Sequence, residues 1–487
     1  MTSLAALFTL AALYFYLFGR NADALRTRWS SFAVSFLVCW PAAVLAKESG
    51  LLFPLFALLC ELLTRNVGER IISRRVLITV LGLGGGVTFF LGLYFWDVLL
   101  SGYRFRDFTL VERLLTESRV LWFHLAQLFL PLPDSFSLYH DDFQISRGLL
   151  VPPETLVSIL GWCALIGFAL RMRQKWPILL FAVSWFLVGH ILESSVLPLE
   201  IMHEHRNYLP SLGPLFLFGS LLLAAKEEEG YVPRVVFLIS FTSFCVLLTG
   251  LRANQWGDEY RRATFEAAAH PDSARANYQA ALIVIKRAEA TNSLGNPVAF
   301  QAINYYLVRS SELDKDAKAP LIGLLYLACQ VHLSRNEEQL TLLMARLSSA
   351  RFSPGDLGVY KGLSELLVEN RLCLKDHEVQ RLLASALENP LLDASAKGLI
   401  LSVGMDFAFA KMKSIPLAME YANRAISVDP SSVSLRLNLV HLLLKAGERE
   451  RAVEAYMQFA KMKVPAAQRK ELNELEQLLG LDSRYAG

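Results

Sequence analysis

The segment from His190 to Gly213, HILESSVLPLEIMHEHRNYLPSLG, decides how this chain is organised. Strongly apolar stretches flank it on both sides, so it lies at or near a membrane surface. Ionisable groups are costly at that depth and usually mark a site or a pathway. We therefore expect a functional site here rather than an ordinary polar loop. Its candidate residues are Glu193, Glu200, His203, Glu204, His205, Arg206 and Tyr208.

Composition predicts a membrane half followed by a soluble half. The chain has 487 residues, which is long for one domain, and 54% of them are apolar. The apolar excess falls almost wholly before about residue 251, whereas the later part is charged, alanine-rich and helical in pattern. We therefore expect a membrane domain over residues 1–252 and a soluble domain over residues 253–487. A net charge of +3, without a Lys/Arg run interleaved with aromatics, argues against a nucleic-acid partner.

Hydropathy predicts an all-α fold whose first half is a polytopic helical bundle of about eight membrane spans. Several of the spans are shorter than the roughly 20 residues that usually cross the hydrocarbon core. The interval 101–154 carries too many charges for a lipid-facing span, so we expect amphipathic helices at the membrane surface there. The predicted spans are residues 4–17, 31–46, 51–63, 76–100, 155–170, 176–192, 212–225 and 232–251.

The distribution of Lys and Arg predicts the orientation. Alternating spans put the basic segments 20–28, 65–75, 171–175 and 226–234 on one side, and short basic loops normally face the cytoplasm. The opposite side then holds Lys47 and Glu48, the interval 101–154, the loop 193–210 and everything after residue 252. We expect an integral protein, in a bacterial inner membrane, with its C-terminal half in the periplasm; in a eukaryote that half would be lumenal.

The soluble half is predicted to be a helical repeat array, an α-solenoid. Small residues recur where paired helices would cross closely, and the spacing fits a 34-residue tetratricopeptide repeat. Such arrays present a concave surface that binds a partner. A plain helical bundle is the alternative. The residues that fit the pattern are Ala418, Ala422, Ala425 and Pro430, with Ala452 and Tyr456 in the next repeat and His270-Pro271-Asp272 opening an earlier one.

The cysteines and histidines do not predict a metal centre. None of the six cysteines has zinc-type or Cys-x-x-Cys spacing, and the spacing indicates no disulfide framework. Cys329 and Cys373 can pair only in an oxidising compartment. The two imidazoles of His203-Glu204-His205 do not fall on one helix face. We therefore predict no metal and no cofactor, while a divalent ion is not excluded.

Polar groups on the predicted outer side suit a lipid substrate with a phosphorylated head. Arg presents a fixed fork of donors to phosphate, and a carboxylate can take a proton from an acceptor hydroxyl. Besides the 193–208 loop, the groups are Lys47, Glu48, Arg104, Arg106, Tyr139, His140, Asp141, Asp142 and Arg147.

Four stretches carry a resemblance to a known family: Ala46–Ser49, the basic turn after Leu63, Tyr139–Phe143 (YHDDF) and Glu204–Ser211 (EHRNYLPS). They resemble the membrane glycosyltransferases of the GT-C superfamily that carry tetratricopeptide repeats, and are similar to the transmembrane-and-repeat protein O-mannosyltransferases. The resemblance implies transfer of a sugar from a polyprenyl-phosphate donor to an acceptor outside the cytoplasm. It also implies that the repeats hold this acceptor, a protein or a glycan.

The resemblance also assigns residues, by their positions in this sequence. It implies that Arg206 binds the donor phosphate, that Glu48 and Glu204 serve as positioning groups, and that Tyr208 packs against a neighbour or contacts a hydroxyl. For Glu48 the alternative is a charge at a helix end paired with Lys47. The expected substrate-binding set is Lys47, Glu48, Tyr139, His140, Asp141, His203, Glu204, His205, Arg206 and Tyr208.

One feature departs from that family. Its members usually carry a key acidic residue in the first external loop, whereas the segment Met1–Ala5 resembles the start of a later helix. We expect either that Met1 is an internal methionine of a longer frame or that this copy has lost its base. The catalytic residue is therefore unassigned, with Glu48 and Glu204 as weak candidates, and full activity of the chain as written is not expected.

Two other functions remain open. An enzyme resembling an O-antigen ligase or polymerase moves a whole glycan from a lipid carrier and needs an external loop with essential Arg and His, for which Arg147 and His140 are candidates. A non-catalytic membrane scaffold would instead recruit partners through its repeats.

A reporter enzyme fused after Gly487 tests the predicted orientation. We expect phosphatase activity of a C-terminal alkaline phosphatase fusion, because that enzyme matures only outside the cytoplasm. A fusion after residue 175 should be inactive, since that loop is basic and predicted to be cytoplasmic. Phosphatase activity of the fusion at residue 175, and none of the C-terminal fusion, would show that the orientation is the opposite of the predicted one.

Overall fold

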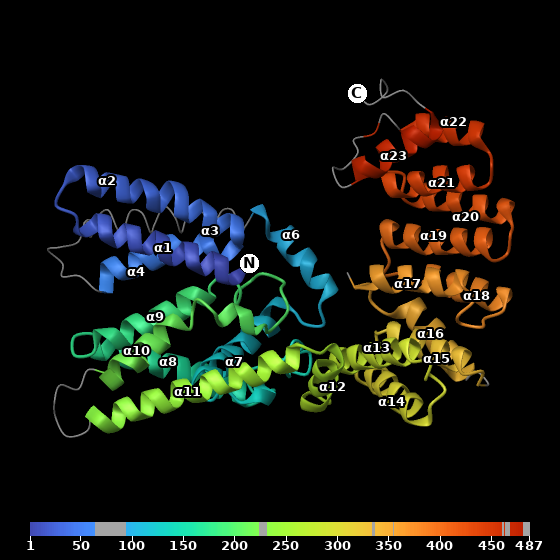
Figure 1. Cartoon of the computed structure of the whole chain (residues 1–487). Coiled ribbons are helices and arrows are strands. Elements are labelled where there is room, and N and C mark those ends of the chain that lie inside the picture. The colour runs from blue at the N-terminus through green and yellow to red at the C-terminus, as the bar shows by residue number, and fades with distance from the viewer. Residues whose placement is uncertain are drawn as a thin grey trace. The chain divides into compact units, whose positions relative to one another are not determined.

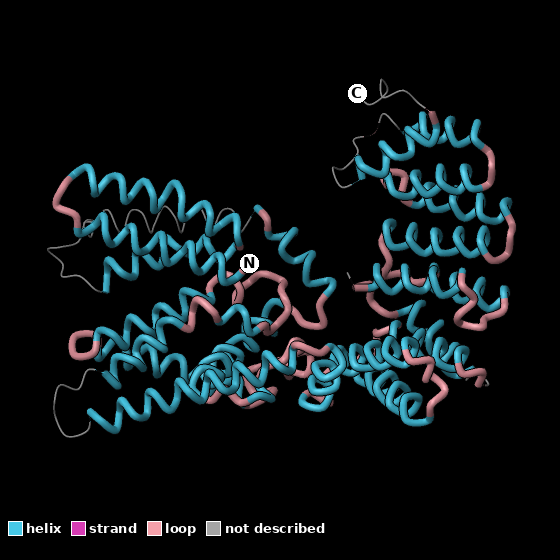
Figure 2. Tube along the Cα trace, viewed as in Figure 1, coloured by secondary structure: helices cyan, strands magenta, loops and turns pink. Residues whose placement is uncertain are grey.

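The computed structural model describes residues 1–63, 94–223, 231–333, 337–353, 355–459, 462 and 468–480. The regular secondary structure of these residues is helical. Beyond an isolated bridge between Gly148 and Val151 they include no strand (Figure 2). The predicted all-α class is therefore confirmed. The chain divides into two compact units, Met1–His270 and Pro271–Gly487, so the first unit extends past residue 252 and includes one further helix.

The first unit contains the apolar helices and the loops that connect them (Figure 1). A π-helical turn, Val34–Cys39, makes α2 and α3 one continuous helix. The helices are α1 (Thr2–Asn21), α2 (Leu25–Ala33), α3 (Trp40–Ala46), α4 (Phe53–Leu63), α6 (Trp96–Ser101), α7 (Leu110–Phe129), α8 (Glu154–Met172), α9 (Pro177–His190), α10 (Leu212–Leu223), α11 (Tyr231–Trp256) and α12 (Glu259–Ala269).

Four helices in the described residues are long and apolar enough to cross a membrane: Thr2–Asn21, Leu25–Ala46, Glu154–Met172 and Val232–Trp256. In the last of these, none of the most apolar stretch is buried inside the protein, as expected for a helix surrounded by lipid. The helices α9 and α10 are apolar but shorter. The described residues of α4 and α10 border segments that the structure does not describe. The predicted span 76–100 falls mostly outside the described residues. The number of eight spans thus stays a prediction.

The charged helix α7 differs from a surface amphipathic helix. A capping box, in which Thr109 and Glu112 exchange hydrogen bonds, sets its start. Its polar stripe is buried inside the unit, with Arg113 fully covered and Glu117 almost so. The loop after α9 covers this stripe. Charges that were expected at the membrane surface are therefore paired within the protein.

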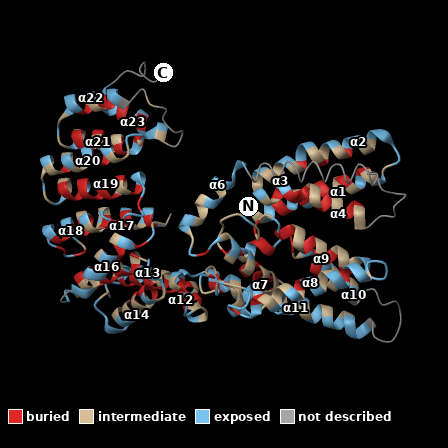
Figure 3. Cartoon of the chain, turned by 180° about the vertical axis from the view of Figure 1, so that it is seen from behind, coloured by how far each residue is buried: buried red, intermediate tan, exposed pale blue. Residues whose placement is uncertain are grey.

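The second unit stacks short helices in successive layers, with the buried residues along their facing sides (Figures 1 and 3). Ala418, Ala422 and Ala425, predicted at a helix crossing, are buried on the helix Ile415–Val428. A Cβ on Gly404 would lie 2.7 Å from the Tyr421 ring, which shows how closely two of these helices approach. Whether the layers are tetratricopeptide repeats stays a prediction. The helices are α13 (Ala274–Ala290), α14 (Pro297–Leu313), α15 (Ala319–Gln330), α16 (Glu337–Ser349), α17 (Asp356–Val368), α18 (Asp376–Leu387), α19 (Ala394–Ala410), α20 (Ile415–Val428), α21 (Val433–Lys445), α22 (Arg449–Phe459) and α23 (Arg469–Leu479).

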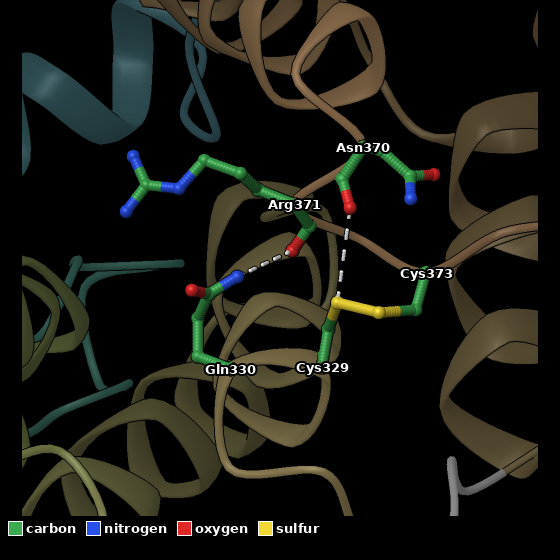
Figure 4. The surroundings of a disulfide bond; sticks show 5 residues. All are labelled: Cys329, Gln330, Asn370, Arg371 and Cys373. Carbon is green, nitrogen blue, oxygen red and sulfur yellow. Dashed lines mark hydrogen bonds between the residues drawn. A yellow bond between two sulfur atoms is a disulfide. The ribbon is translucent and has the colours of Figure 1, made fainter.

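A disulfide between Cys329 and Cys373, which the spacing did not indicate, connects the end of α15 to the turn after α17 (Figure 4). Gln330 Nε2 donates to the Arg371 carbonyl at 3.3 Å beside it. The Arg371 guanidinium contacts Glu289 on α13 at 2.5 Å. Three segments far apart in the sequence are therefore joined at one point, and it is this fold, not a cysteine motif, that brings the two thiols together.

Thiol counting tests the disulfide. The protein has six cysteines, of which Cys39, Cys60, Cys163 and Cys245 are free. Denatured under non-reducing conditions, the protein should take up four maleimide mass tags, and six after reduction. The double variant Cys329→Ala/Cys373→Ala should take up four in both cases. Six tags on the wild type without reductant would contradict the pairing.

Candidate functional site

The guanidinium of Arg113 on α7 makes four hydrogen bonds to the loop 193–206, to which Tyr103 and Arg106 also donate. Arg113 donates to the carbonyls of Glu193 (2.6 Å), Ser195 (3.0 Å), Leu199 (2.6 Å) and Glu200 (3.2 Å). The Arg113 side chain has no exposed surface. Because buried carbonyls must be paired, this one residue satisfies four of the carbonyls that an irregular loop brings into the interior.

Two cations from different segments meet one carboxylate in this loop. Lys47 Nζ lies 2.5 Å from Glu193 Oε1, and Arg206 Nε lies 3.9 Å from Glu193 Oε2. The three side chains are nearly buried. Arg206 also donates through Nη1 to the carbonyl of Glu200 at 2.6 Å, which fixes its fork. The sequence-predicted residues Lys47 and Arg206 are thus brought together, with Glu193 between them.

A second buried acid lies beside this group. Glu117 Oε1 is 2.8 Å from Arg113 Nη2, one helical turn away on α7. Burial raises the pKa of the Glu117 carboxyl to about 7, although Arg113 and a hydrogen bond from Ser194 act in the opposite direction. The cluster therefore contains the cations Lys47, Arg113 and Arg206 around two acids, and one of these acids is only partly ionised near neutral pH.

The remaining loop residues form pairs at its edge. His203 Nε2 lies 3.0 Å from Glu200 Oε2, and Arg106 Nη1 lies 3.8 Å from Glu200 Oε1. The rings of His203 and His205 are stacked with centroids 5.2 Å apart. The imidazole of His203 is thus already engaged by Glu200.

Glu204 connects the loop to the segment after α7. Its Oε1 accepts a hydrogen bond from the Ser137 backbone N–H and lies 3.3 Å from His140 Nε2. His140 is buried, and its ring meets that of His270 edge to face at 5.6 Å. His270 Nδ1 is 2.7 Å from Asp142 Oδ2, a hydrogen bond that raises the pKa of His270 despite its partial burial. The side chains of His140, Asp142 and His270 could together hold a metal ion.

Other predicted residues lie at the surface. Glu48 is exposed and makes no ion pair with Lys47, whose partner is Glu193, so a helix-end pair between the two neighbours is absent. Tyr208 is 58% exposed, and Asp141 and His205 are exposed. Tyr139 is half-buried and donates its backbone N–H to the Ser137 hydroxyl.

Sequence reasoning missed the residues that complete both groups. Arg113 and Glu117 counted only as charges that disfavour a span, and His270 was assigned to the opening of a repeat. Arg113 and Glu117 are four residues apart on an amphipathic helix, and this spacing is a signal from which their ion pair can be predicted. No local signal links His270 to Asp142, which lies 128 residues earlier.

No family model, curated protein or solved structure matches this chain. The site is therefore interpreted from its own residues.

Substituting Arg113 by Lys tests its role in holding the loop. An ammonium cannot reach four carbonyls that diverge from a planar fork, so several buried acceptors lose their donor. We expect a loss of about 3 kcal/mol or more, roughly 6 to 10 °C in the apparent thermal midpoint of the detergent-solubilised protein. Arg147→Lys is the control, because that exposed side chain pairs with Glu112 at the surface. Equal midpoints for both variants would refute the role of Arg113.

Proposed function

We propose that this protein is a membrane glycosyltransferase, or derives from one, that uses a polyprenyl-phosphate-linked sugar as donor. The observation that carries the proposal is the convergence of Lys47 and Arg206 on the single carboxylate of Glu193. Two nearly buried cations that share one acid, beside a third cation on Arg113, make a cluster in which positive charge exceeds ionised acid. Such a cluster suits a phosphate or diphosphate at the membrane boundary.

The donor phosphate would compete with Glu193 for Lys47 and Arg206. Arg206 is held by the Glu200 carbonyl at 2.6 Å, so its remaining donors keep a fixed direction and little side-chain entropy is lost on binding. For the acceptor hydroxyl, the exposed carboxylate of Glu48, adjacent to Lys47 in the chain, is the better candidate base. Glu204 is already engaged by Ser137 and His140.

An apolar pocket supports a prenyl donor. It lies between α7, α8, α9 and α10 and has a cavity volume of about 200 Å³. Its lining is almost purely hydrocarbon, so it suits a lipid chain rather than a polar metabolite. Among the residues that line it are Phe129, Trp162, Phe186, Pro214, Phe218 and Leu221.

The soluble unit fits the role of holding an acceptor outside the cytoplasm. A disulfide persists in oxidising compartments, and the Cys329–Cys373 bond therefore agrees with the periplasmic or lumenal side that the basic loops predict. Stacked helical layers offer an extended surface to a protein or glycan.

Photo-crosslinking with a polyprenyl-phosphate analogue tests the proposal. Wild-type protein in nanodiscs should be labelled, and excess undecaprenyl phosphate should suppress the label. Lys47→Ala and Arg206→Ala should each reduce labelling about tenfold or more, since each removes a charge-assisted contact. Glu193→Gln should label at least as strongly as wild type, because it removes the competing carboxylate.

The control for this experiment is Arg173→Ala, which removes an exposed guanidinium from the basic loop 171–175 that is predicted to be cytoplasmic. Labelling of that variant should be unchanged. A scaffold without a donor site predicts no competable labelling of the wild type. Equal labelling of the Lys47, Arg206 and Arg173 variants would likewise contradict the proposal.

A further inference from the structure

A second cluster of ionisable groups lies where α12 ends against the segment that follows α7. His140, Asp142 and His270 each offer a ligand atom, and these atoms lie within 4.8 Å of one another. The His270 side chain is 12% exposed and that of Asp142 is 22% exposed. His140 is buried. Three potential ligands from two distant segments thus meet in a largely covered position.

We propose that His140, Asp142 and His270 form a binding site for a divalent first-row transition metal, with Zn²⁺ as the best-suited ion. Two imidazoles and one carboxylate are a ligand set that such ions take readily, leaving one position open. This site is separate from the donor-phosphate group at Lys47 and Arg206 and does not depend on that function.

The geometry requires only small side-chain rotations. Metal–ligand bonds of about 2.0 to 2.1 Å in a tetrahedron put neighbouring ligand atoms about 3.3 Å apart. Asp142 and His270 are already closer than this, at 2.7 Å, and the largest separation of 4.8 Å closes with shifts of roughly 1 Å per side chain.

The surrounding charges favour a cation. Asp142 and Glu204 lie beside the two imidazoles, while the neighbouring carboxylate of Glu266 is paired with Arg252 at 3.7 Å. A dication would neutralise Asp142 and Glu204 together. Glu204, 3.3 Å from His140, is also the kind of outer carboxylate that orients a metal-binding imidazole.

Occupancy of the site would connect three segments of the first unit. The ion would join the end of α12 to residues 140–142 and, through His140, to Glu204 at the start of the 3₁₀ turn Glu204–Asn207. The loop 193–206 would then be fixed from two sides, by Arg113 and by the metal-bound segment.

Titration with Co²⁺, a spectroscopic substitute for Zn²⁺, tests the site in the purified full chain after treatment with chelator. We expect one Co²⁺ per chain with the visible absorption of a tetrahedral nitrogen–oxygen site, and its displacement by one equivalent of Zn²⁺. Asp142→Asn and His140→Gln should weaken binding about a hundredfold, since outer partners alone are worth about 10- to 100-fold. The exposed neighbour provides the matched control, Asp141→Asn, which should bind as wild type does.

Several results would overturn the assignment. These are a failure to bind one ion per chain, equal affinity of the Asp142→Asn and Asp141→Asn variants, and a sulfur-to-cobalt charge-transfer band. Loss of binding in His203→Gln but not in His140→Gln would move the ion to the other histidine pair. Electron paramagnetic resonance of the Cu²⁺-loaded His203→Gln variant tests the site without altering its proposed ligands. Hyperfine coupling to two imidazole nitrogens is expected, and a spectrum without it contradicts the site.

Discussion

The buried guanidinium of Arg113 is the interaction on which the first unit depends. An irregular loop between two apolar helices exposes carbonyls that water cannot reach, and each unpaired carbonyl costs free energy comparable to a lost hydrogen bond. Arg113 satisfies four of them at once. A planar fork with five donors is suited to this task, and its own charge is balanced by Glu117 at 2.8 Å. The polar loop is thus stabilised by a helix that lies 80 residues earlier.

The bonding of Arg113 also determines which cations pair with Glu193. With Arg113 satisfied by carbonyls and by Glu117, Lys47 and Arg206 are left to share one carboxylate. Burial raises the pKa of Glu117 to about 7, so positive charge exceeds negative charge in this group around neutral pH. The proposed donor phosphate relies on this excess of positive charge. Ionisable groups buried in this way are seldom structural necessities, because apolar packing would hold the helices at lower cost.

How much of this was readable from the sequence depends on the range of the interaction. Helices follow from hydropathy and periodicity, which are local, and the all-α class and the apolar first half could be predicted. The stretch His203–Arg206 stood out because its polar residues are adjacent in the chain. Ion pairs and hydrogen bonds between distant segments were not predictable. Glu193 contacts Lys47 across 146 residues, and Glu266 contacts Ser137 across 129. The sequence offered Cys329–Cys373 only as a pair that needs an oxidising compartment, because helix stacking across a separation of 44 residues, rather than a motif, aligns the thiols.

The loop 193–206 contacts both clusters, since Arg206 pairs with Glu193 and Glu204 lies 3.3 Å from His140, and this links the clusters mechanically. Glu204 and Arg206 belong to one 3₁₀ turn, Glu204–Asn207, in which neighbouring side chains project in different directions. Glu204 therefore turns toward His140, while Arg206 turns toward Glu193. Asn207 in the same turn donates to the His124 carbonyl at 3.0 Å and fixes the turn against α7. Because a short turn moves as a unit, any group that engages His140, Asp142 or His270 constrains the direction of the Arg206 fork as well. The position of the Arg206 guanidinium would then depend on whether the neighbouring cluster is filled, which gives a physical reason for one loop to contact both sets of charges.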